Sequence, residues 1–497
     1  MGLRILFYVP DNRITHSYMP TLWPHLLKAL TPPGHPVTTL DGNVLRLDAP
    51  GLADYVRGGR FDLVGIGGMT RTIHRSYAVA DSIRALGVPV IMGGPHVTEE
   101  PEEALEHADA VACGEADVLW PQVLADFEAG RLRPVYRSCE KPQLENYPRI
   151  DWKETDFKQF SVLPRWLYRG LKAAGWERFD LNVTPMETGR GCPYRCDFCT
   201  VSPFFGEMIR FRTNESVIEE LKLLERLGRR MVFFVDDNFA INPRRTKSLL
   251  RAMIDAGVRI PWTAQISMNL LRDPELLDLM KLSRCICIFI GLESVLPESL
   301  AEVSKTFNKP EQYAGIIGEL QRRGIYCVTA FIFGMDADRP GVAGKTWEVV
   351  RSWPPGFFPV FSQLTPLPGT PLFKSLREQG RLRERHWLNY RPYGTAFLPK
   401  QLTPQQLEQE IGTAWELAYS PCGVLERVQR MRGLPFLAKF IYAFTTFAFR
   451  GIYFRQMNVK AWLRILWNYR HTLGVVFSPG SRSRRQTSRL PAPLGSR

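Results

Sequence analysis

The sequence lacks several features that would place it in a familiar class. It contains no run of about 20 apolar residues without charge, so no membrane-spanning helix is predicted. The opening apolar run is too short for a signal peptide, and we expect a cytoplasmic protein. A GxxxxGK(S/T) phosphate loop and a GxGxxG motif near the first predicted strand are both missing, which excludes the common nucleotide-binding loops.

Acidic residues are in deficit. The 497 residues include 50 Asp and Glu against 64 Lys and Arg, which gives a formal net charge of +14 at pH 7. The excess lies mainly in the C-terminal part, where basic charge suits nucleic acid, an anionic membrane surface or only solvent. The grouped cysteines described next are typical of an enzyme, and for this reason no nucleic-acid partner is expected.

Cysteine is scarce, but three of the nine cysteines stand close together. Cys192, Cys196 and Cys199 form a C-x3-C-x2-C run. A structural zinc site usually uses four ligands, commonly two C-x2-C pairs, and no second pair follows. Three thiolates on one loop suit three irons of a [4Fe-4S] cube and leave the fourth iron open to a substrate or cosubstrate. The other six are read as buried apolar or loop residues: Cys113, Cys139, Cys285, Cys287, Cys327 and Cys422.

Residues 1–130 alternate short apolar strands with helical patterns, which predicts a doubly wound parallel sheet. Strands are expected over 3–9, 37–40, 61–67, 88–92 and 108–112, and helices over 18–30, 71–86 and up to 127. Ligands of such sheets bind beyond the carboxyl ends of the strands. The candidate residues there are Gly67, Gly68, Met69, Thr70, Gly93, Gly94, His96, Gly114 and Glu115. The glycines leave room for a large flat ligand, or they serve only tight turns.

Residues 181–400 repeat a strand–helix unit and predict a partial (β/α)6 barrel, with chemistry at the carboxyl ends of its strands. The six expected strands cover 181–188, 230–235, 262–265, 285–290, 326–333 and 363–371, and the helices cover 216–227, 243–256, 274–281 and 310–323. Asn214 is the expected cap of the first of these helices. Polar or small residues at the strand ends are Asp236, Asp237, Gln265, Glu293, Ser294 and Gly334. The two adjacent acids have a second interpretation, as a cap for the next helix.

The run Gly191-Cys-Pro-Tyr-Arg-Cys-Asp-Phe-Cys199 resembles the signature of radical S-adenosylmethionine (SAM) enzymes. The resemblance implies that the three cysteines bind a [4Fe-4S] cluster whose open iron chelates the amino and carboxylate groups of SAM. It also implies that an electron from the cluster cleaves SAM, and that Phe198 lies near the adenine. The sequences around Asp236, Glu293 and Pro366 resemble the SAM-contacting strands of the cobalamin-dependent subgroup.

Residues 93–115 resemble the cobalamin-binding domain that precedes the barrel in class B radical SAM enzymes. The resemblance implies bound cobalamin. The D-x-H-x-x-G motif that supplies a cobalt-ligating histidine in many cobalamin proteins is missing, so we expect no histidine on cobalt. His96 is interpreted as a turn residue that lines the pocket, and a metal ligand is its second interpretation. A domain that has lost cobalamin remains the alternative.

Residues 131–180 are predicted to connect the domains, 401–475 to be helical, and 476–497 to be disordered. The stretches 434–454 and 462–470 mix aromatic with basic residues, which suits a membrane interface or helices packed over the barrel. The resemblance and this apolar region together predict a C-methyltransferase for an unactivated carbon of a lipid-like substrate, as in hopanoid methylases. The alternative is a radical reaction without methylation: cyclisation, oxidation or carbon–carbon coupling. A reductant such as flavodoxin or ferredoxin, and peripheral contact at the inner face of the membrane, complete the expected partners.

Overall fold

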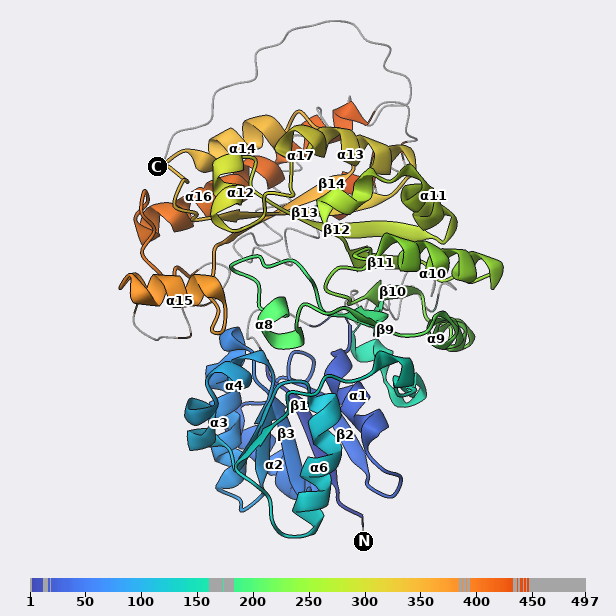
Figure 1. Ribbon diagram of the computed structural model, residues 1–497, viewed down its shortest axis with the longest axis vertical. Coiled ribbons are helices and arrows are strands. Elements are labelled where there is room, and N and C mark those ends of the chain that lie inside the picture. Colours follow the sequence, from blue (N-terminus) through green and yellow to red (C-terminus); the bar gives the residue numbers. More distant parts are fainter. Residues whose placement is uncertain are drawn as a thin grey trace, which may run out of the picture. The chain divides into compact units, whose positions relative to one another are not determined.

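The computed structural model describes residues 2–11, 17, 19–160, 173, 183–383, 387, 390 and 394–431, together with 436, 439, 440, 442, 443, 445 and 446. The chain divides into two compact units, Met1–Leu417 and Ala418–Arg497. The described part of the first unit contains two six-stranded parallel sheets and one small antiparallel pair (Figure 1).

The first sheet has the strand order β2-β1-β3-β4-β5-β6. Strand β2 therefore lies on one side of β1, and the later strands follow in order on the other side. Its strands are β1 (Ile5–Val9), β2 (Val37–Asp41), β3 (Leu63–Gly67), β4 (Val90–Gly93), β5 (Ala110–Cys113) and β6 (Val135–Arg137). The five strands expected from the sequence are confirmed. The sheet also includes β6, which lies in the segment that the sequence assigned to the connector.

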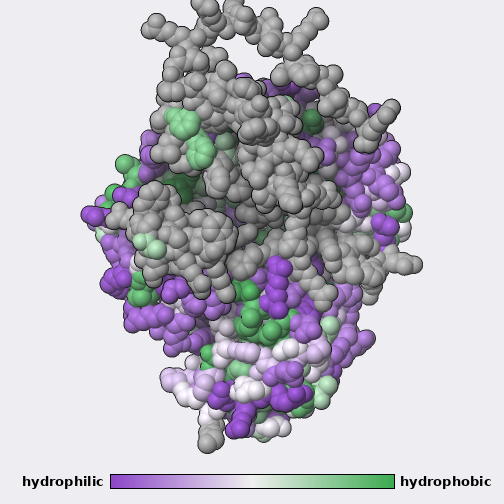
Figure 2. All heavy atoms as spheres, turned by 180° about the vertical axis from the view of Figure 1, so that it is seen from behind, coloured by the Kyte–Doolittle hydropathy of each residue, from purple (hydrophilic) through white to green (hydrophobic). Residues whose placement is uncertain are grey.

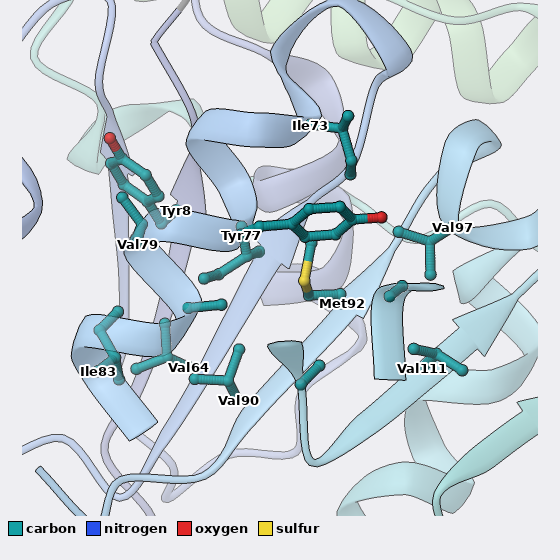
Figure 3. Packing of buried hydrophobic residues seen from close by; sticks show 14 of the residues in the cluster. Tyr8, Val64, Ile73, Tyr77, Val79, Ile83, Val90, Met92, Val97 and Val111 are labelled. Carbon is teal, nitrogen blue, oxygen red and sulfur yellow. The ribbon is translucent and has the colours of Figure 1, made fainter. Parts of the chain in front are cut away.

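Helices cover both faces of the first sheet. They are α1 (Leu22–Leu30), α2 (Ala49–Gly59), α3 (Ile73–Arg84), α4 (Pro95–Glu99), α5 (Pro101–His107) and α6 (Ala116–Glu128), with a 3-10 turn η1 (Thr70–Thr72) before α3. One apolar core joins the sheet to α2, α3 and α5, and another joins it to α1 and α6. In the first core, Tyr77 of α3 lies beside Met92 of β4, with Ile73 and Val97 nearby (Figure 3). The predicted doubly wound fold is therefore confirmed.

The second sheet has the order β14-β13-β12-β11-β10-β7, with parallel pairing throughout. Its strands are β7 (Val183–Met186), β10 (Met231–Phe234), β11 (Trp262–Gln265), β12 (Cys285–Glu293), β13 (Tyr326–Phe333) and β14 (Phe357–Gln363). Its helices are α9 (Asn214–Arg226), α10 (Pro243–Asp255), α11 (Pro274–Leu282), α12 (Pro297–Glu302), α13 (Pro310–Arg322), α14 (Val342–Val350) and α15 (Pro371–Glu378), with a 3-10 segment η6 (Met268–Arg272). The partial barrel of six strands is confirmed.

Two local predictions for the barrel were wrong. The sixth strand is β14 and not 363–371, because that later stretch carries several prolines, which lack the N–H that a strand ladder needs. It forms the loop before α15, whose first turn is capped by Thr370. The cap of α9 is Thr213 rather than Asn214, since the Thr213 side chain accepts a hydrogen bond from the Ser216 amide.

Shorter elements carry the segments around the three cysteines. The antiparallel pair β8 (Gly189–Arg190) and β9 (Arg210–Phe211) flanks α8 (Val201–Phe205). The connector contains the 3-10 turns η2 (Leu144–Asn146), η3 (Trp152–Glu154) and η4 (Phe157–Phe160). Trp152 is fully buried and donates its indole N–H to Glu220 of α9 at 2.9 Å, so this part of the connector is fixed to the barrel.

The C-terminal region begins with α16 (Pro404–Tyr419) and α17 (Pro421–Arg430), which confirms helices there with a break at Pro421. Most of 434–454, and all of 462–470 and 476–497, lie outside the described residues. None of the helices that the structure describes is both long and apolar enough to span a membrane. On the face shown in Figure 2, hydrophilic residues cover most of the described surface.

Candidate active site

The loop with the three cysteines follows β7 and β8 and is fixed by backbone geometry. Gly191 has φ = 97°, and a Cβ there would lie 2.6 Å from the carbonyl oxygen of Met208, so only glycine fits. The Cys192 amide donates to the Gly206 carbonyl at 3.3 Å, and the Cys199 amide donates to the Cys196 carbonyl at 3.0 Å. The loop therefore has a defined shape before any metal is considered.

The same loop is attached to parts of the barrel far away in sequence. The Asp197 amide donates to the Val303 carbonyl at 3.3 Å, and the Leu372 amide donates to the Asp197 carbonyl at 2.9 Å. The Ser304 hydroxyl also donates to the Asp197 carboxylate at 3.1 Å. The cysteine loop thus joins the segment after α12 and the start of α15.

The three thiols are close enough to influence one another electrostatically, and each is partly buried. Burial raises the pKa of Cys192 to about 11, that of Cys196 to about 12, and that of Cys199 above its usual value. Thiols that are neutral at pH 7 must release protons when they bind iron. Among the residues that the structure describes, no three Cys, His, Asp or Glu side chains converge on one ion position. A [4Fe-4S] cube instead offers a separate iron to each thiolate, so the three thiols fit the cluster.

A buried ion pair lies beside the cysteine loop, at the end of β12. Glu293 accepts a hydrogen bond from the Lys305 ammonium, and both residues are buried. Burial opposes the charge of Lys305, but Glu293 and the thiols of Cys196 and Cys199 outweigh it and raise the pKa of Lys305. The Lys305 nitrogen lies 5.9 Å from the Phe198 ring centre. Lys305 was not identified from the sequence, because it belongs to no motif and lies just beyond the short helix α12.

The two adjacent acids after β10 have different surroundings. Asp236 accepts hydrogen bonds from the Thr188 amide at 2.7 Å and the Thr188 hydroxyl at 2.6 Å, and burial raises its pKa to about 7. Asp237 accepts a bond from the Gly191 amide at 3.3 Å, and burial raises its pKa to about 6. Asp237 is therefore the acid that faces the cysteine loop. The cap interpretation is wrong, because Asn242 caps α10.

The other candidates at the barrel strand ends are engaged locally. The Ser294 hydroxyl accepts from the Leu296 amide at 3.0 Å, and the Gln265 carbonyl accepts from the Phe239 amide at 2.9 Å. Gly334 has φ = 105°, and a Cβ there would lie 2.8 Å from the Leu407 side chain. The Gly334 amide donates to Asp338 at 2.8 Å.

The glycines at the carboxyl ends of β3 and β4 support each other. The Gly68 amide donates to the Gly93 carbonyl at 2.7 Å. Gly94 has φ = 113°, and a Cβ there would lie 2.9 Å from the Gly68 carbonyl oxygen. A Cβ at Gly67 would lie 3.1 Å from the Trp23 ring, and the Gly114 amide donates to the Thr98 hydroxyl at 2.9 Å. These glycines therefore allow the turns after β3 and β4 to approach closely. This favours the interpretation that the glycine pairs serve tight turns.

His96 is buried, and both of its ring nitrogens have neighbours. Nδ1 lies 3.1 Å from the Thr70 hydroxyl, and Nε2 lies 3.5 Å from the Glu103 carboxylate. The ring also meets Trp387 edge-on, with centroids 4.7 Å apart. His96 is thus a structural residue with no free nitrogen for a metal. Met69, in the turn after β3, is 48% exposed.

Glu115 faces the barrel domain. Its buried carboxylate lies 2.6 Å from Arg190, 2.9 Å from Arg210 and 3.3 Å from Lys141. The sequence placed Glu115 among the cobalamin contacts, whereas its oxygens are occupied by these cations. Arg190, which directly precedes Gly191, was not identified from the sequence.

The fold and the cysteine loop define an enzyme with an iron–sulfur site in a partial barrel and a second, doubly wound cofactor domain. Residues 186–338 match the radical SAM superfamily, and residues 15–124 match the B12 binding domain. Bacteriochlorophyllide d C-12(1)-methyltransferase of Chlorobaculum tepidum is 31% identical over 373 residues, which cover 74% of this chain and 77% of the relative.

A second relative and a solved structure are also similar to this chain. Hopanoid C-2 methylase of Rhodopseudomonas palustris is 25% identical, and the match covers 65% of this chain and 58% of the relative. The structure of the radical SAM methyltransferase TsrM from Kitasatospora setae, with tryptophan and a SAM analogue bound, has a TM-score of 0.67 at 19% identity and covers 86% of this chain and 91% of that chain. The chain belongs to the cobalamin-dependent radical SAM methyltransferases.

The cofactors of this enzyme are a [4Fe-4S] cluster, SAM and cobalamin. The cluster supplies an electron and an open iron, SAM supplies a methyl group and the means to abstract hydrogen, and cobalamin carries the methyl group. Cys192, Cys196 and Cys199 are the residues that would hold the cluster.

Proposed function

We propose that the enzyme methylates an unactivated carbon of a large apolar molecule, with a tetrapyrrole of the bacteriochlorophyllide kind as the first candidate substrate. The single observation that carries this proposal is the likeness to bacteriochlorophyllide d C-12(1)-methyltransferase, which extends over most of both chains. A lipid is the second candidate, because hopanoid C-2 methylase is also similar.

Within the site, we assign separate tasks to the residues around the cysteine loop. Glu293, Ser294 and Gln265 stand at strand ends and would bind the polar groups of SAM, with Phe198 beside the adenine. Lys305 holds Glu293 in place, and its positive charge favours the thiolate forms of Cys196 and Cys199. Asp237 orients the Gly191 amide, and thereby the backbone that leads to Cys192.

At the first sheet, the turn residues are the proposed floor of the cobalamin site. They are Gly67, Gly68, Met69, Thr70, Gly93, Gly94 and Gly114. Because His96 has neighbours at both ring nitrogens, we propose that cobalamin binds without a histidine from this chain on cobalt.

The reaction balances with two molecules of SAM and two electrons. One SAM gives its methyl group to the substrate and leaves as S-adenosylhomocysteine. The other takes the hydrogen from the substrate carbon and leaves as methionine and 5′-deoxyadenosine. A reductant such as flavodoxin or ferredoxin supplies the electrons. A non-methylating reaction would produce 5′-deoxyadenosine without S-adenosylhomocysteine, which separates the two alternatives.

The test uses the full chain, prepared anaerobically with iron, sulfide and hydroxocobalamin. It is incubated with SAM, a reductant, and either bacteriochlorophyllide d or a hopanoid. We expect a macrocycle product heavier by one methylene, with equimolar S-adenosylhomocysteine and 5′-deoxyadenosine. A methylated hopanoid would favour the second candidate, and 5′-deoxyadenosine alone would overturn methylation. The Cys196→Ala chain should give neither product.

Cytoplasmic location and peripheral contact at the inner membrane face remain predictions. The basic aromatic stretches on which the membrane prediction rests lie largely outside the described residues. Flotation of the full chain with vesicles of anionic lipid, compared with neutral lipid, would test it.

A further inference from the structure

An ionic network that is buried except at Lys141 joins the edge of the first sheet to the cysteine loop. It consists of three acids and three cations: Glu115, Asp117, Glu187, Lys141, Arg190 and Arg210. The opposite charges balance. Glu115 and Asp117 stand at the start of α6, directly after β5, whereas Arg190 and Arg210 belong to β8 and β9.

Arg190 is the centre of this network. Its guanidinium donates to Glu187 at 2.8 and 2.7 Å, to Glu115 at 2.6 Å, and to Asp117 at 3.0 and 3.3 Å. Glu115 also receives a bidentate pair of bonds from Arg210, at 3.0 and 2.9 Å. Side-chain exposure is 5% for Arg190 and 1% for Glu115. Charges so deeply buried are stable only beside close partners of opposite sign, so the network has one favoured geometry.

The position of the network relates the two cofactor domains. Arg190 is followed directly by Gly191 and Cys192, so a shift of its backbone moves the first cysteine of the loop. Glu115 follows Gly114 at the carboxyl end of β5, the edge at which ligands of doubly wound sheets bind. Planar guanidinium groups with bidentate bonds fix orientation as well as distance.

We propose that this ionic network is a positioning device that sets the distance between the iron–sulfur cluster and cobalamin. Arg190, Glu115 and Asp117 are positioning residues, because they act through the loop and not on a reacting atom. The inference rests on the proposed function only in that both cofactors bind to one chain. Loss of one acid should leave each domain folded and let the two cofactor edges move against each other.

The chain provides a matched control within one helix. Asp117 and Asp126 both belong to α6 and are paired with arginine. Asp117 is 13% exposed and lies 3.0 Å from Arg190, and Asp126 is 16% exposed and lies 2.8 Å from Arg133. Asp117→Asn breaks a contact across the domains, whereas Asp126→Asn breaks a similar contact inside the first domain. Glu115→Gln is the stronger variant of the network.

The experiment compares these variants as full chains, reconstituted with cluster and cobalamin and then reduced. The probe is the magnetic coupling between cob(II)alamin and the reduced cluster in the EPR spectrum, which falls with the cube of their separation. We expect a single coupling in the wild type and in Asp126→Asn, and a broadened or lost coupling in Asp117→Asn and Glu115→Gln. Equal couplings in all four proteins, or equal loss in both aspartate variants, would overturn the proposal.

A second readout needs neither cofactor. In the metal-free chains, amide hydrogen exchange over residues 187–192 should be about tenfold faster in Asp117→Asn than in Asp126→Asn. If the wild type binds no cobalt, the proposed function fails, and this measurement still decides whether the network holds the loop. Equal exchange in the two variants would then refute the positioning role.

Discussion

Lys305 keeps its positive charge although burial opposes it, because the carboxylate of Glu293 lies beside it. Replacing it by methionine would leave Glu293 buried without its cation. We expect Lys305→Met to lower the free energy of unfolding of the metal-free protein by about 3 kcal/mol. Lys345→Met, at an exposed position, is the control. Urea unfolding measures both, and equal small losses would contradict the assignment.

Asp236 gives stability a pH dependence whose sign is opposite to that of most carboxylates. Its pKa of about 7 in the folded chain lies above its ordinary value of 3.8, so the folded state holds the proton more tightly than the unfolded state. The free energy of unfolding should therefore decrease as pH rises from about 4 to about 7. Asp236→Asn should flatten this slope in thermal unfolding of the metal-free chain. An unchanged slope would show that other groups cause it.

At the scale of elements, one helix supplies the cap of another. Glu410 of α16 accepts hydrogen bonds from the amides of Gly341 at 2.6 Å and Ala343 at 2.9 Å, at the start of α14. We expect Glu410→Ala to reduce the free energy of unfolding by about 1 kcal/mol. Glu416→Ala removes an exposed carboxylate from the same helix and should have little effect on a chemical denaturation curve.

The elements found from the sequence are those with strong local patterns. The strands predicted over 262–265 and 326–333 agree with β11 and β13 at both ends, because apolar runs there stand between turn residues. β14 was missed because Pro359 interrupts an otherwise apolar strand. α2 was missed because Pro50 and its glycines hide the helical pattern.

The site residues likewise fall into two groups: those that a local sequence pattern reveals, and those that only the fold brings together. The three cysteines were found because their spacing is local, and a metal-binding loop needs nothing more. The Arg190–Glu115 contact joins positions 75 residues apart, so no window of sequence contains it. Likewise, the sequence showed that Asp236 and Asp237 end a strand, but only the fold shows which of them faces the loop.

At the scale of the whole molecule, one apolar core contains residues from both sheets' domains. Phe373, Trp387, Tyr390 and Ala396 belong to the same buried group as the first sheet and α3. We therefore expect calorimetry of the metal-free chain to show the two domains unfolding together.

Trp387 tests this coupling, because its indole N–H also donates to Glu103 at 2.8 Å. Trp387→Ala should separate the unfolding transitions of the two domains. It should also lower the temperature of the first transition, with a loss of about 3–5 kcal/mol in free energy of unfolding. Trp353 is buried among Tyr313, Phe331 and Phe357 within the barrel, so Trp353→Ala should destabilise without separating the transitions. Separation in both variants would contradict the shared core.

The attachments of Asp197 also bear on when the enzyme matures in the cell. Its backbone is bonded to Val303 and Leu372, which leave the ribosome long after the cysteines do. A nascent chain that has exposed only the cysteines has not yet made the contacts that shape their loop. We therefore expect iron and sulfide to be delivered to a chain synthesised past residue 372, and the assembly machinery to recognise a nearly complete barrel rather than an emerging peptide.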